Sequence, residues 1–553
     1  MEQKRLLMAI GLSFLVFFVW SIAFAPKRPE HPTEQNQALK STESAEVKKE
    51  SSAPAPGAVQ KEADKTEAAL EPPQGNREAR SIIVETPLYR MTLSENGGGV
   101  TSMILKSYRE TVAADSPAKE LIPKETRGGT ALTSFGTGNS LEGAFFKTDR
   151  ETDKIDVRGQ PSDLRFSHRT AEGVRIDKSY RFYPNSYLVD LNISISNESK
   201  QAIQGPLKVT LRHTMPIGAL NYGFQGPSGL IDGALEQVKI KDIEKKSKIS
   251  GSLQWIAIEE LYFMECLISK KPSNGTMAMS YQDDLLQNQM ISETGEIASG
   301  ASITEAYSIF MGPKSISVLK AAGYDLDKAI NFGWVEVIAK PCLYFMNFIH
   351  SYIPNYGIAI ILLTIISRLI FWPLATKSYK SMNDMRKLQP LMQEIREKYK
   401  DDKAKINQET MALYRTYKVN PMGGCLPMLI QMPVFFALYR MLYQAIELRH
   451  APFFGWINDL SAPDRLFNFS FKIPFMTPPY GIPVLTIIMG ATMLLQQKLS
   501  PQAGDPTQAK MMMLMPIVFT FIFINFPSGL VLYWLVSNLV SIGQQYYIMK
   551  RSA

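Results

Sequence analysis

The chain has 553 residues and a formal net charge of +8, a length that favours more than one domain over a single hydrophobic core. Its three cysteines and five histidines form no CxxC or HExxH motif, and no phosphate-binding glycine loop is present, which argues against metal, nucleotide and disulfide-framework classes. Basic residues flank long apolar runs instead of forming a nucleic-acid-binding stripe, and this pattern is typical of a membrane protein. Because the motifs above are missing, we expect neither catalytic residues nor a cofactor.

Residues 1–25 place Lys4 and Arg5 before an uncharged apolar stretch that ends at Phe24. The end of this stretch fits a signal-peptide cleavage site, but its length is close to the about 20 residues that span a bilayer. We therefore favour a retained transmembrane anchor over a cleaved signal peptide, and either one predicts a cytoplasmic N-terminus. Residues 26–79 are rich in Pro, Ala, Glu, Lys, Gln and Ser and are predicted to form a disordered, exported tether.

Residues 80–330 have the pattern of an exported β-sandwich domain. In SYLVDLNISIS, every second residue from Tyr187 to Ile195 is apolar, as in a half-buried strand, and Gly97–Gly99 mark a turn between two further strands. Many short strands separated by turns are typical of a sandwich. Nothing in this region marks a catalytic cluster, and the adjacent Glu259 and Glu260 are predicted to be solvated surface residues.

Residues 331–355 are predicted to form an amphipathic helix at the membrane surface. Trp334, Ile338, Phe345 and Ile349 recur at helical spacing beside polar residues. A helix packed on the sandwich is the alternative.

The remaining residues, 356–549, contain the apolar runs of a membrane core. The loop 377–418 holds eleven Lys and Arg against six Asp and Glu, whereas the loop 443–478 holds three of each. This alternation places both termini in the cytoplasm and the sandwich outside. With the anchor, the runs predict six transmembrane helices, five of them in the core: 357–375, 425–442, 482–495, 511–526 and 530–548.

The cytoplasmic loop 377–418 is itself predicted to be a hairpin of two helices. Apolar residues from Met385 to Tyr399 and from Ile406 to Tyr417 follow helical spacing, and Asp401 and Asp402 form the turn. A solvated hairpin and a methionine-rich docking arm for a cytoplasmic partner are both compatible with this pattern.

Arg368 lies deep inside the first core span. It is nine residues from Lys377, about 13 Å along a helix, which is too far for its side chain to reach the cytoplasmic surface. Because a central arginine costs about 2.5–3.5 kcal/mol on insertion scales, we expect it to face a hydrated cavity. The alternative is an arginine satisfied by carbonyls and polar side chains within the bundle. The polar residues expected near it are Thr364, Gln431, Tyr533 and Ser537. By contrast, Arg440 lies near a polar boundary, and snorkelling is sufficient to explain it.

Three stretches resemble the YidC/Oxa/Alb family of membrane protein insertases: TIISRLIFWPLATKSYKSM, VNPMGGCLPMLIQMPVFFALYRML and FPSGLVLYWLVSNLVSIGQQ. The resemblance covers 332–545, and the anchor, tether and sandwich are similar to the long Gram-negative form. It implies an insertase and folding chaperone whose hydrophilic groove contains Arg368, Thr364 and Gln431. Phe435 and Met515 are the implied lipid-side substrate contacts. Trp534 departs from the family pattern, in which a second tyrosine is expected, and the tail after Ile548 is short.

The same resemblance implies a bacterial inner-membrane protein with a periplasmic large domain. Its implied partners are nascent membrane proteins, the SecYEG translocon and SecDF, the lipid bilayer, and the ribosome and signal recognition particle system through the cytoplasmic loops, with no direct contact to nucleic acid. A secondary transporter for an anionic solute remains the main alternative function. A sugar-binding or epimerase module anchored by the spans is a further alternative.

Overall fold

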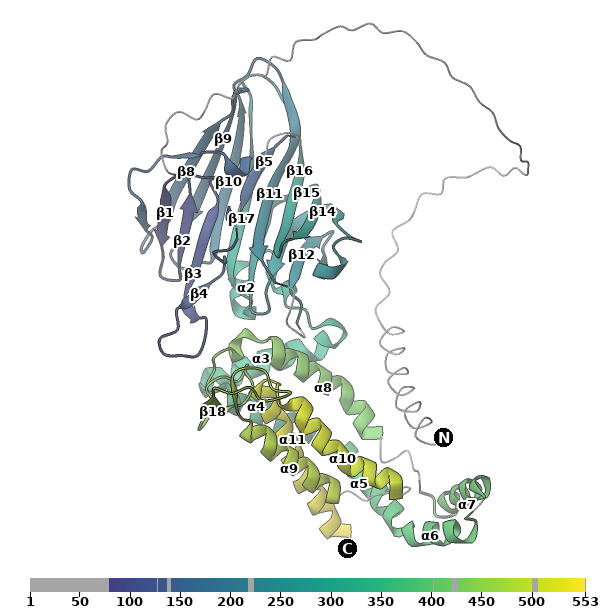
Figure 1. The fold of residues 1–553 in the computed structure, drawn as a ribbon. Coiled ribbons are helices and arrows are strands. Elements are labelled where there is room, and N and C mark those ends of the chain that lie inside the picture. The colour runs from purple at the N-terminus through teal and green to yellow at the C-terminus, as the bar shows by residue number, and fades with distance from the viewer. Residues whose placement is uncertain are drawn as a thin grey trace, which may run out of the picture. The chain divides into compact units, whose positions relative to one another are not determined.

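The computed structural model describes residues 79–126, 128–136, 141–216, 223–400, 402–419, 426–499 and 506–552. The anchor predicted at 1–25, and all but the last residue of the predicted tether, lie outside the described residues. Strands occupy the purple-to-teal part of the chain and helices most of the green-to-yellow part (Figure 1).

The β-rich region, Ser81–Pro313, contains two sheets among the described residues. Buried side chains from both sheets form one hydrophobic cluster, as in a sandwich. The five-stranded sheet has the order β4-β3-β2-β1-β7, with β1 Ser81–Glu85, β2 Tyr89–Ser94, β3 Val100–Arg109, β4 Ala118–Glu120 and β7 Lys154–Asp156.

The larger sheet has twelve strands, and its longest path runs β13-β12-β14-β15-β17-β10-β9-β8-β6. Strand β11 pairs with β5 and with β16, and β16 also pairs with β15. The strands of this sheet are β5 Leu132–Phe135, β6 Lys147–Thr148, β8 Ser162–Arg169, β9 Val174–Phe182, β10 Leu188–Asn197, β11 Ile203–Thr214, β12 Gly226–Ile231, β13 Ala234–Gln237, β14 Lys248–Glu259, β15 Phe263–Gln282, β16 Leu285–Ile297 and β17 Ser302–Pro313.

The strand predicted from SYLVDLNISIS is confirmed. In β10, every second residue from Val189 to Ile195 is fully buried, and the intervening side chains are partly or fully exposed. The period of two puts one face of the strand into the core, and β10 lies between β9 and β17, both antiparallel to it. The apolar alternation therefore specified both the strand and its buried face.

The helical region follows a short helix, α2 (Ile316–Ala322). Its helices are α3 Glu336–Tyr352, α4 Tyr356–Ile370, α5 Trp372–Lys387, α6 Gln389–Lys398, α7 Lys403–Thr416, α8 Leu426–Gln444, α9 Val484–Leu499, α10 Pro506–Phe523 and α11 Ser528–Ser552. Within the described ranges, no individual helix has both the length and the apolar composition needed to cross a bilayer; α4 and α5 together meet that test but are bent by 63°.

The span predicted at 357–375 falls on this bent pair and is not one continuous helix. Helix α4 ends at Ile370, and α5 starts at Trp372 after Phe371. Pro373 lies in the first turn of α5, where its missing N–H does no harm, but in a continuous helix it would remove the bond to Leu369 and clash with the preceding turn. The proline explains the bend.

The helix predicted from Met385 to Tyr399 is also interrupted. Helix α5 ends at Lys387, and α6 begins at Gln389 with Pro390 in its first turn. The acidic turn lies before α7, where the Asp402 carboxylate accepts a hydrogen bond from the Lys405 N–H at 3.0 Å and caps the helix. The charged segment thus forms three helical pieces.

Two glycines allow close approach in the helical region. A Cβ on Gly490 in α9 would lie 2.2 Å from the Thr520 hydroxyl of α10, so a larger residue would separate these helices. Gly333, with a φ of +65°, precedes α3, and a Cβ there would lie 2.6 Å from Nη1 of Arg440. That nitrogen donates a hydrogen bond to the Phe332 carbonyl at 2.9 Å, so Arg440 is held by a protein contact and the snorkelling interpretation is incomplete.

Candidate functional site

Arg368 lies in the last turn of α4, one turn before the bend. The helix is started by Asn355, whose side chain accepts a hydrogen bond from the Ile358 N–H at 3.1 Å. From this start the helix carries Arg368 into the bundle, where its side chain is partly buried. The position of the cation is thus set by a capped helix with a proline-defined end.

The guanidinium of Arg368 contacts two other helices. Its Nη1 donates to Oε1 of Gln431 in α8 at 3.1 Å, and its Nη2 donates to the hydroxyl of Ser537 in α11. Its Nε is buried without a hydrogen-bond partner among the described residues. Both acceptors are neutral, so the positive charge is positioned by dipoles and is not cancelled by a carboxylate.

Thr364 and Tyr533 lie near this contact along their own helices. Thr364 is one turn before Arg368 and fully buried, but its hydroxyl donates to the Ile360 carbonyl of α4 at 2.6 Å. Tyr533 is buried one turn before Ser537 on α11. The structure therefore joins Arg368, Gln431 and Ser537 directly by hydrogen bonds, whereas Thr364 bonds within its own helix.

A strip of buried polar side chains continues along α11 beyond Ser537. Ser541 donates to the Ser537 carbonyl at 2.8 Å, and Gln544 donates to the Trp372 carbonyl at the start of α5 at 3.0 Å. Gln545 is buried, and both polar atoms of its amide lack a hydrogen-bond partner within the described ranges. The two glutamines were missed from the sequence, although Gln545 continues the spacing of four residues from Ser537 through Ser541.

Phe435 and Met515 occupy different environments. Phe435 packs edge-on against Trp534 of α11, with ring centroids 4.7 Å apart. Trp534 also packs against Phe523 of α10, at 4.5 Å. Met515 is exposed on α10. Trp534, the residue that departs from the family pattern, is therefore the centre of an aromatic cluster.

Chemically, the Arg368 cluster can attract a negative charge or donate to a peptide carbonyl. No Asp or Glu occurs in α4, α8, α9, α10 or α11. A charge surrounded by protein and hydrocarbon acts through a lower effective dielectric than a charge in water, so its attraction for an anion is stronger. Such an arrangement binds without bond-making chemistry.

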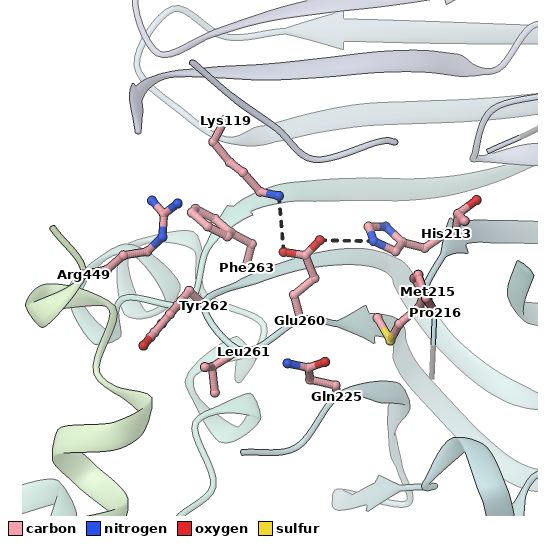
Figure 2. A pocket seen from close by; sticks show the side chains of 11 residues that line it. Lys119, His213, Met215, Pro216, Gln225, Glu260, Leu261, Tyr262, Phe263 and Arg449 are labelled. Carbon is pink, nitrogen blue, oxygen red and sulfur yellow. Dashed lines mark ion pairs between the residues drawn. The ribbon is translucent and has the colours of Figure 1, made fainter. Parts of the chain in front are cut away.

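A second polar cluster lines a cavity of about 250 Å³ and uses side chains of the β-rich region (Figure 2). Nε2 of His213 lies 3.1 Å from Glu260, and Nδ1 lies 2.8 Å from Glu265. Burial by itself lowers the pKa of His213, but its hydrogen bonds to the two carboxylates outweigh this and raise the pKa to about 9. Lys119 approaches Glu260 to 3.6 Å. In this cluster, the cationic side chains of His213 and Lys119 are therefore paired with the carboxylates of Glu260 and Glu265.

This cluster corrects the surface prediction for Glu259 and Glu260. Glu259 is fully buried, and its carboxylate accepts a hydrogen bond from Nζ of Lys314 at 2.6 Å. Glu260 is bonded to His213 and lies at the cavity. Glu259 is the last residue of β14 and Glu260 is the first residue after it, so the two adjacent carboxylates each have a separate cation, Lys314 and His213.

Comparison with known proteins matches each half of the chain to a protein-family model. Residues 81–345 match the family model described as YidC periplasmic domain, and residues 348–553 match the model described as 60Kd inner membrane protein. The chain is 40% identical to a protein of Pelobacter propionicus named membrane protein insertase YidC, over 99% of each chain. It is also 40% identical to the protein of that name from Syntrophus aciditrophicus, over 100% of each chain.

A solved structure described as an active YidC insertase with its first transmembrane domain resolved is also similar. It is 20% identical in sequence, with a TM-score of 0.37, and the match covers 85% of this chain and 93% of that one.

Proposed function

Since the chain belongs to the YidC family of membrane protein insertases, we propose that it passes nascent transmembrane segments into the bilayer through a hydrophilic groove at Arg368. Its substrates are nascent membrane proteins, and its role is non-enzymatic. The groove is formed by residues of α4, α8 and α11, and it receives the polar end of a segment that must cross the membrane.

One observation carries this proposal. Arg368 is held by neutral groups of two neighbouring helices, Gln431 and Ser537, while its Nε has no partner among the described residues. A buried donor without a partner costs free energy, and a buried charge costs more. An incoming carboxylate or peptide carbonyl can supply the missing acceptor. The unpaired amide of Gln545, further along α11, extends the same polar surface.

The mechanism follows from electrostatics and hydrocarbon burial. A short acidic or polar tail enters the groove and interacts transiently with Arg368, which shortens the path that it must cross through hydrocarbon. The membrane potential, about 2.3 kcal/mol per charge per 100 mV, draws an acidic tail outward. The apolar part of the segment leaves sideways into lipid, since burying its apolar surface is favourable. Phe435 and Met515 lie on the proposed exit route.

The proposed membrane arrangement has six spans, with both termini in the cytoplasm and the β-rich region in the periplasm. Helix α3 supports an interfacial position at residues 331–355: one face packs on α4 and α8, while Trp334, Val337, Phe348 and Tyr352 leave an exposed apolar stripe. This stripe differs from the predicted one, because Ile349 is buried. The domain limits 1–25, 26–79, 80–330, 331–355 and 356–549 are part of this proposal.

We further propose that SecYEG and SecDF cooperate with the chain at the membrane. The ribosome and the signal recognition particle system are assigned to the cytoplasmic hairpin, 377–418. Exposed Met411 on α7 and Tyr417, the residue just after it, offer apolar contacts for such a partner.

Site-specific crosslinking tests the groove. A photoreactive amino acid is placed at Gln431, Tyr533 or Ser537 during synthesis of a small membrane protein with an acidic N-terminal tail. We expect adducts with the nascent chain at each position, and fewer adducts when the acidic residues of the tail are replaced by lysine. Exposed Asn407 on α7 provides the control position. Adducts at Asn407 with none at the three groove positions would overturn the proposal.

A further inference from the structure

The connection between α8 and α9 contains a segment, residues 466–482, that presents phenylalanines outward. We call it the aromatic loop. Strands β18 (Leu466–Phe469) and β19 (Tyr480–Ile482) form its base, with Leu466 paired to Ile482. Phe467 is 67% exposed, Phe471 61% and Phe475 85%. A single exposed apolar residue is ordinary, but three large aromatic side chains within nine residues form a patch that requires a function.

The backbone of this loop is strained at two of the three phenylalanines. Phe467 has a φ of +59° and Phe475 a φ of +62°, the left-handed region that side chains with a Cβ seldom adopt. Glycine or asparagine would adopt this conformation at lower cost. Strain of this kind persists only where the surrounding structure holds it, and it accumulates at functional sites.

Hydrogen bonds hold the loop against the C-terminal end of α10. Arg465, just before the loop, donates to the Ile524 carbonyl at 2.8 Å. The Asn525 amide donates to the Phe475 carbonyl at 2.8 Å and accepts from the Thr477 N–H at 2.9 Å. The strained, exposed Phe475 is therefore fixed in place and does not belong to a freely moving tip.

Apolar side chains continue from the loop onto both neighbouring helices. Ile487 and Ile488 are exposed at the start of α9, and Phe521 and Ile522 are exposed near the end of α10. The loop contains no acidic residue and one lysine, Lys472. Apolar side chains next to a single cation match the boundary between acyl chains and phosphate headgroups.

We propose that the aromatic loop inserts Phe467, Phe471 and Phe475 into the outer leaflet and anchors this end of the helical region in the lipid boundary. The inference rests on the proposed membrane arrangement, in which the loop follows α8 on the periplasmic side. Lipid is favoured over a protein partner because α9, which follows the loop, and α10, whose end bonds to it, also expose apolar side chains, and in a membrane protein such side chains meet hydrocarbon.

Spin labelling of the full-length protein in phosphatidylcholine–phosphatidylglycerol nanodiscs tests the proposal. Cys266, Cys342 and Cys425 are replaced by alanine, and single cysteines are placed at Phe471 and Phe475. We expect labels at these positions to collide more with oxygen, which concentrates in the acyl region, than with a water-soluble nickel complex. Asn468, exposed in the same loop, is the matched control and should favour nickel.

Labels at Ile488 and Phe521 distinguish the failure of this inference from the failure of the proposed function. Nickel-dominated collisions at Phe471 and Phe475, with oxygen-dominated collisions at Ile488 and Phe521, would overturn the lipid anchor and leave the membrane core intact. Nickel-dominated collisions at all four positions would overturn the membrane arrangement, and the anchor with it.

The substitutions Phe475→Gly and Phe475→Trp distinguish a role of this side chain in lipid contact from a role in folding of the loop. Phe475→Gly relieves the left-handed strain, so a purely structural role predicts unchanged or slower amide exchange in the loop. Lipid contact predicts exchange about tenfold faster in nanodiscs, since the side chain loses its burial. Phe475→Trp should keep the protection. Faster exchange for Phe475→Trp than for Phe475→Gly would contradict the anchor.

Discussion

The β-rich region and the helical region handle buried charge in different ways. His213 lies between Glu260 and Glu265, and Glu259 is bonded to Lys314. Arg368, by contrast, has hydrogen bonds only to neutral side chains, those of Gln431 in α8 and Ser537 in α11, in the part of the chain that the structure describes. The ion pairs of the β-rich region contribute to a defined fold. A cation without an ion-pair partner can instead interact with an anionic or polar group of an incoming polypeptide.

This difference follows from the residues that surround each buried cation. The apolar helices of the helical region contain no carboxylate, so Arg368 cannot be neutralised from within them. A stable helical bundle would be served as well by a neutral residue of similar size. The charge is therefore the feature to test first.

The substitution Arg368→Met is expected to have the largest effect, a loss of insertion activity. Methionine keeps much of the apolar stem and removes the charge, so we expect insertion of a client with an acidic tail to fall about ten- to hundredfold, the scale of one or two charged hydrogen bonds. Thermal stability should stay unchanged or rise. Insertion into inverted vesicles and thermal unfolding in detergent measure the two effects.

Arg368→Lys is the control for charge, and it should retain more activity than the methionine variant because it keeps the cation but loses the second contact. Parallel loss of insertion and of folded protein in both variants would show that Arg368 is a structural residue, and the contrast between the two regions would disappear.

His213→Ala tests the opposite behaviour in the β-rich region. It leaves the buried Glu265 without a cation, whereas the partly exposed Glu260 keeps Lys119, and we expect a loss of about 3–5 kcal/mol in the free energy of unfolding, mainly from Glu265. Faster amide exchange in β11 and β15 measures the loss. His213→Gln is also neutral but can still donate one hydrogen bond, so it should cost less; equal costs would indicate that this hydrogen bond contributes nothing and that the loss comes from the charge.

The same histidine predicts a pH dependence. Its pKa is about 9 in the folded protein against an ordinary 6.5, so the folded state holds a proton that the unfolded state has released. The stabilisation is complete below pH 6.5 and is lost as the pH rises through 9. Because Lys178 titrates in an overlapping range, the effect is measured as a difference: the free energy of unfolding of the wild type minus that of His213→Ala, from urea unfolding, should decrease between pH 6 and pH 10.

Lys178 in β9 sharpens the comparison, because it is a buried lysine with only carbonyl acceptors. Its Nζ donates to Ala131 at 3.0 Å and Gly97 at 3.3 Å, and burial lowers its pKa to about 7 from 10.5. The unfolded state binds the proton more tightly, so the contribution of Lys178 to stability, measured as the wild type minus Lys178→Met, should rise between pH 7 and pH 10.5. Lys178→Met should remove this rise and add about 1–3 kcal/mol at pH 7. If the stability of Lys178→Met still increased by the same amount between pH 7 and pH 10.5, the increase could not be due to Lys178.

The smallest expected effect comes from the glycine beside Arg440. Gly333→Ala places a methyl group against the guanidinium and strains a φ of +65°, and we expect a loss of about 1 kcal/mol in detergent unfolding. Gly455 has a φ of +67° and no atom near its missing Cβ. Gly455→Ala should therefore lose less free energy of unfolding than Gly333→Ala. Equal losses would show that the destabilisation comes from the positive φ and not from the contact with Arg440.

Sequence patterns predicted local features well where one residue type dictates one conformation. The alternation in β10 gave the correct buried face, and the position of Arg368 singled out the residue that bridges α8 and α11. Pro373 could have predicted the bend at Phe371, but the apolar residues on both sides of it were interpreted as one span. The burial of Glu259 and Glu260 had no local signal, since their partners lie at Lys314 and His213.

The sequence by itself determined the periodicity of strands and helices, the glycine and proline breaks, and the absence of any acidic residue from the apolar runs. These properties depend on residues that are neighbours along the chain. The sequence indicated four polar candidates near Arg368, and only the tertiary structure decided that Gln431 and Ser537 are the two that bond to it. Only the tertiary structure decided, too, that Gln545 is buried without a partner among the described residues and that strained phenylalanines are exposed. Contacts between distant segments depend on how the elements pack, and local patterns contain no information about that packing.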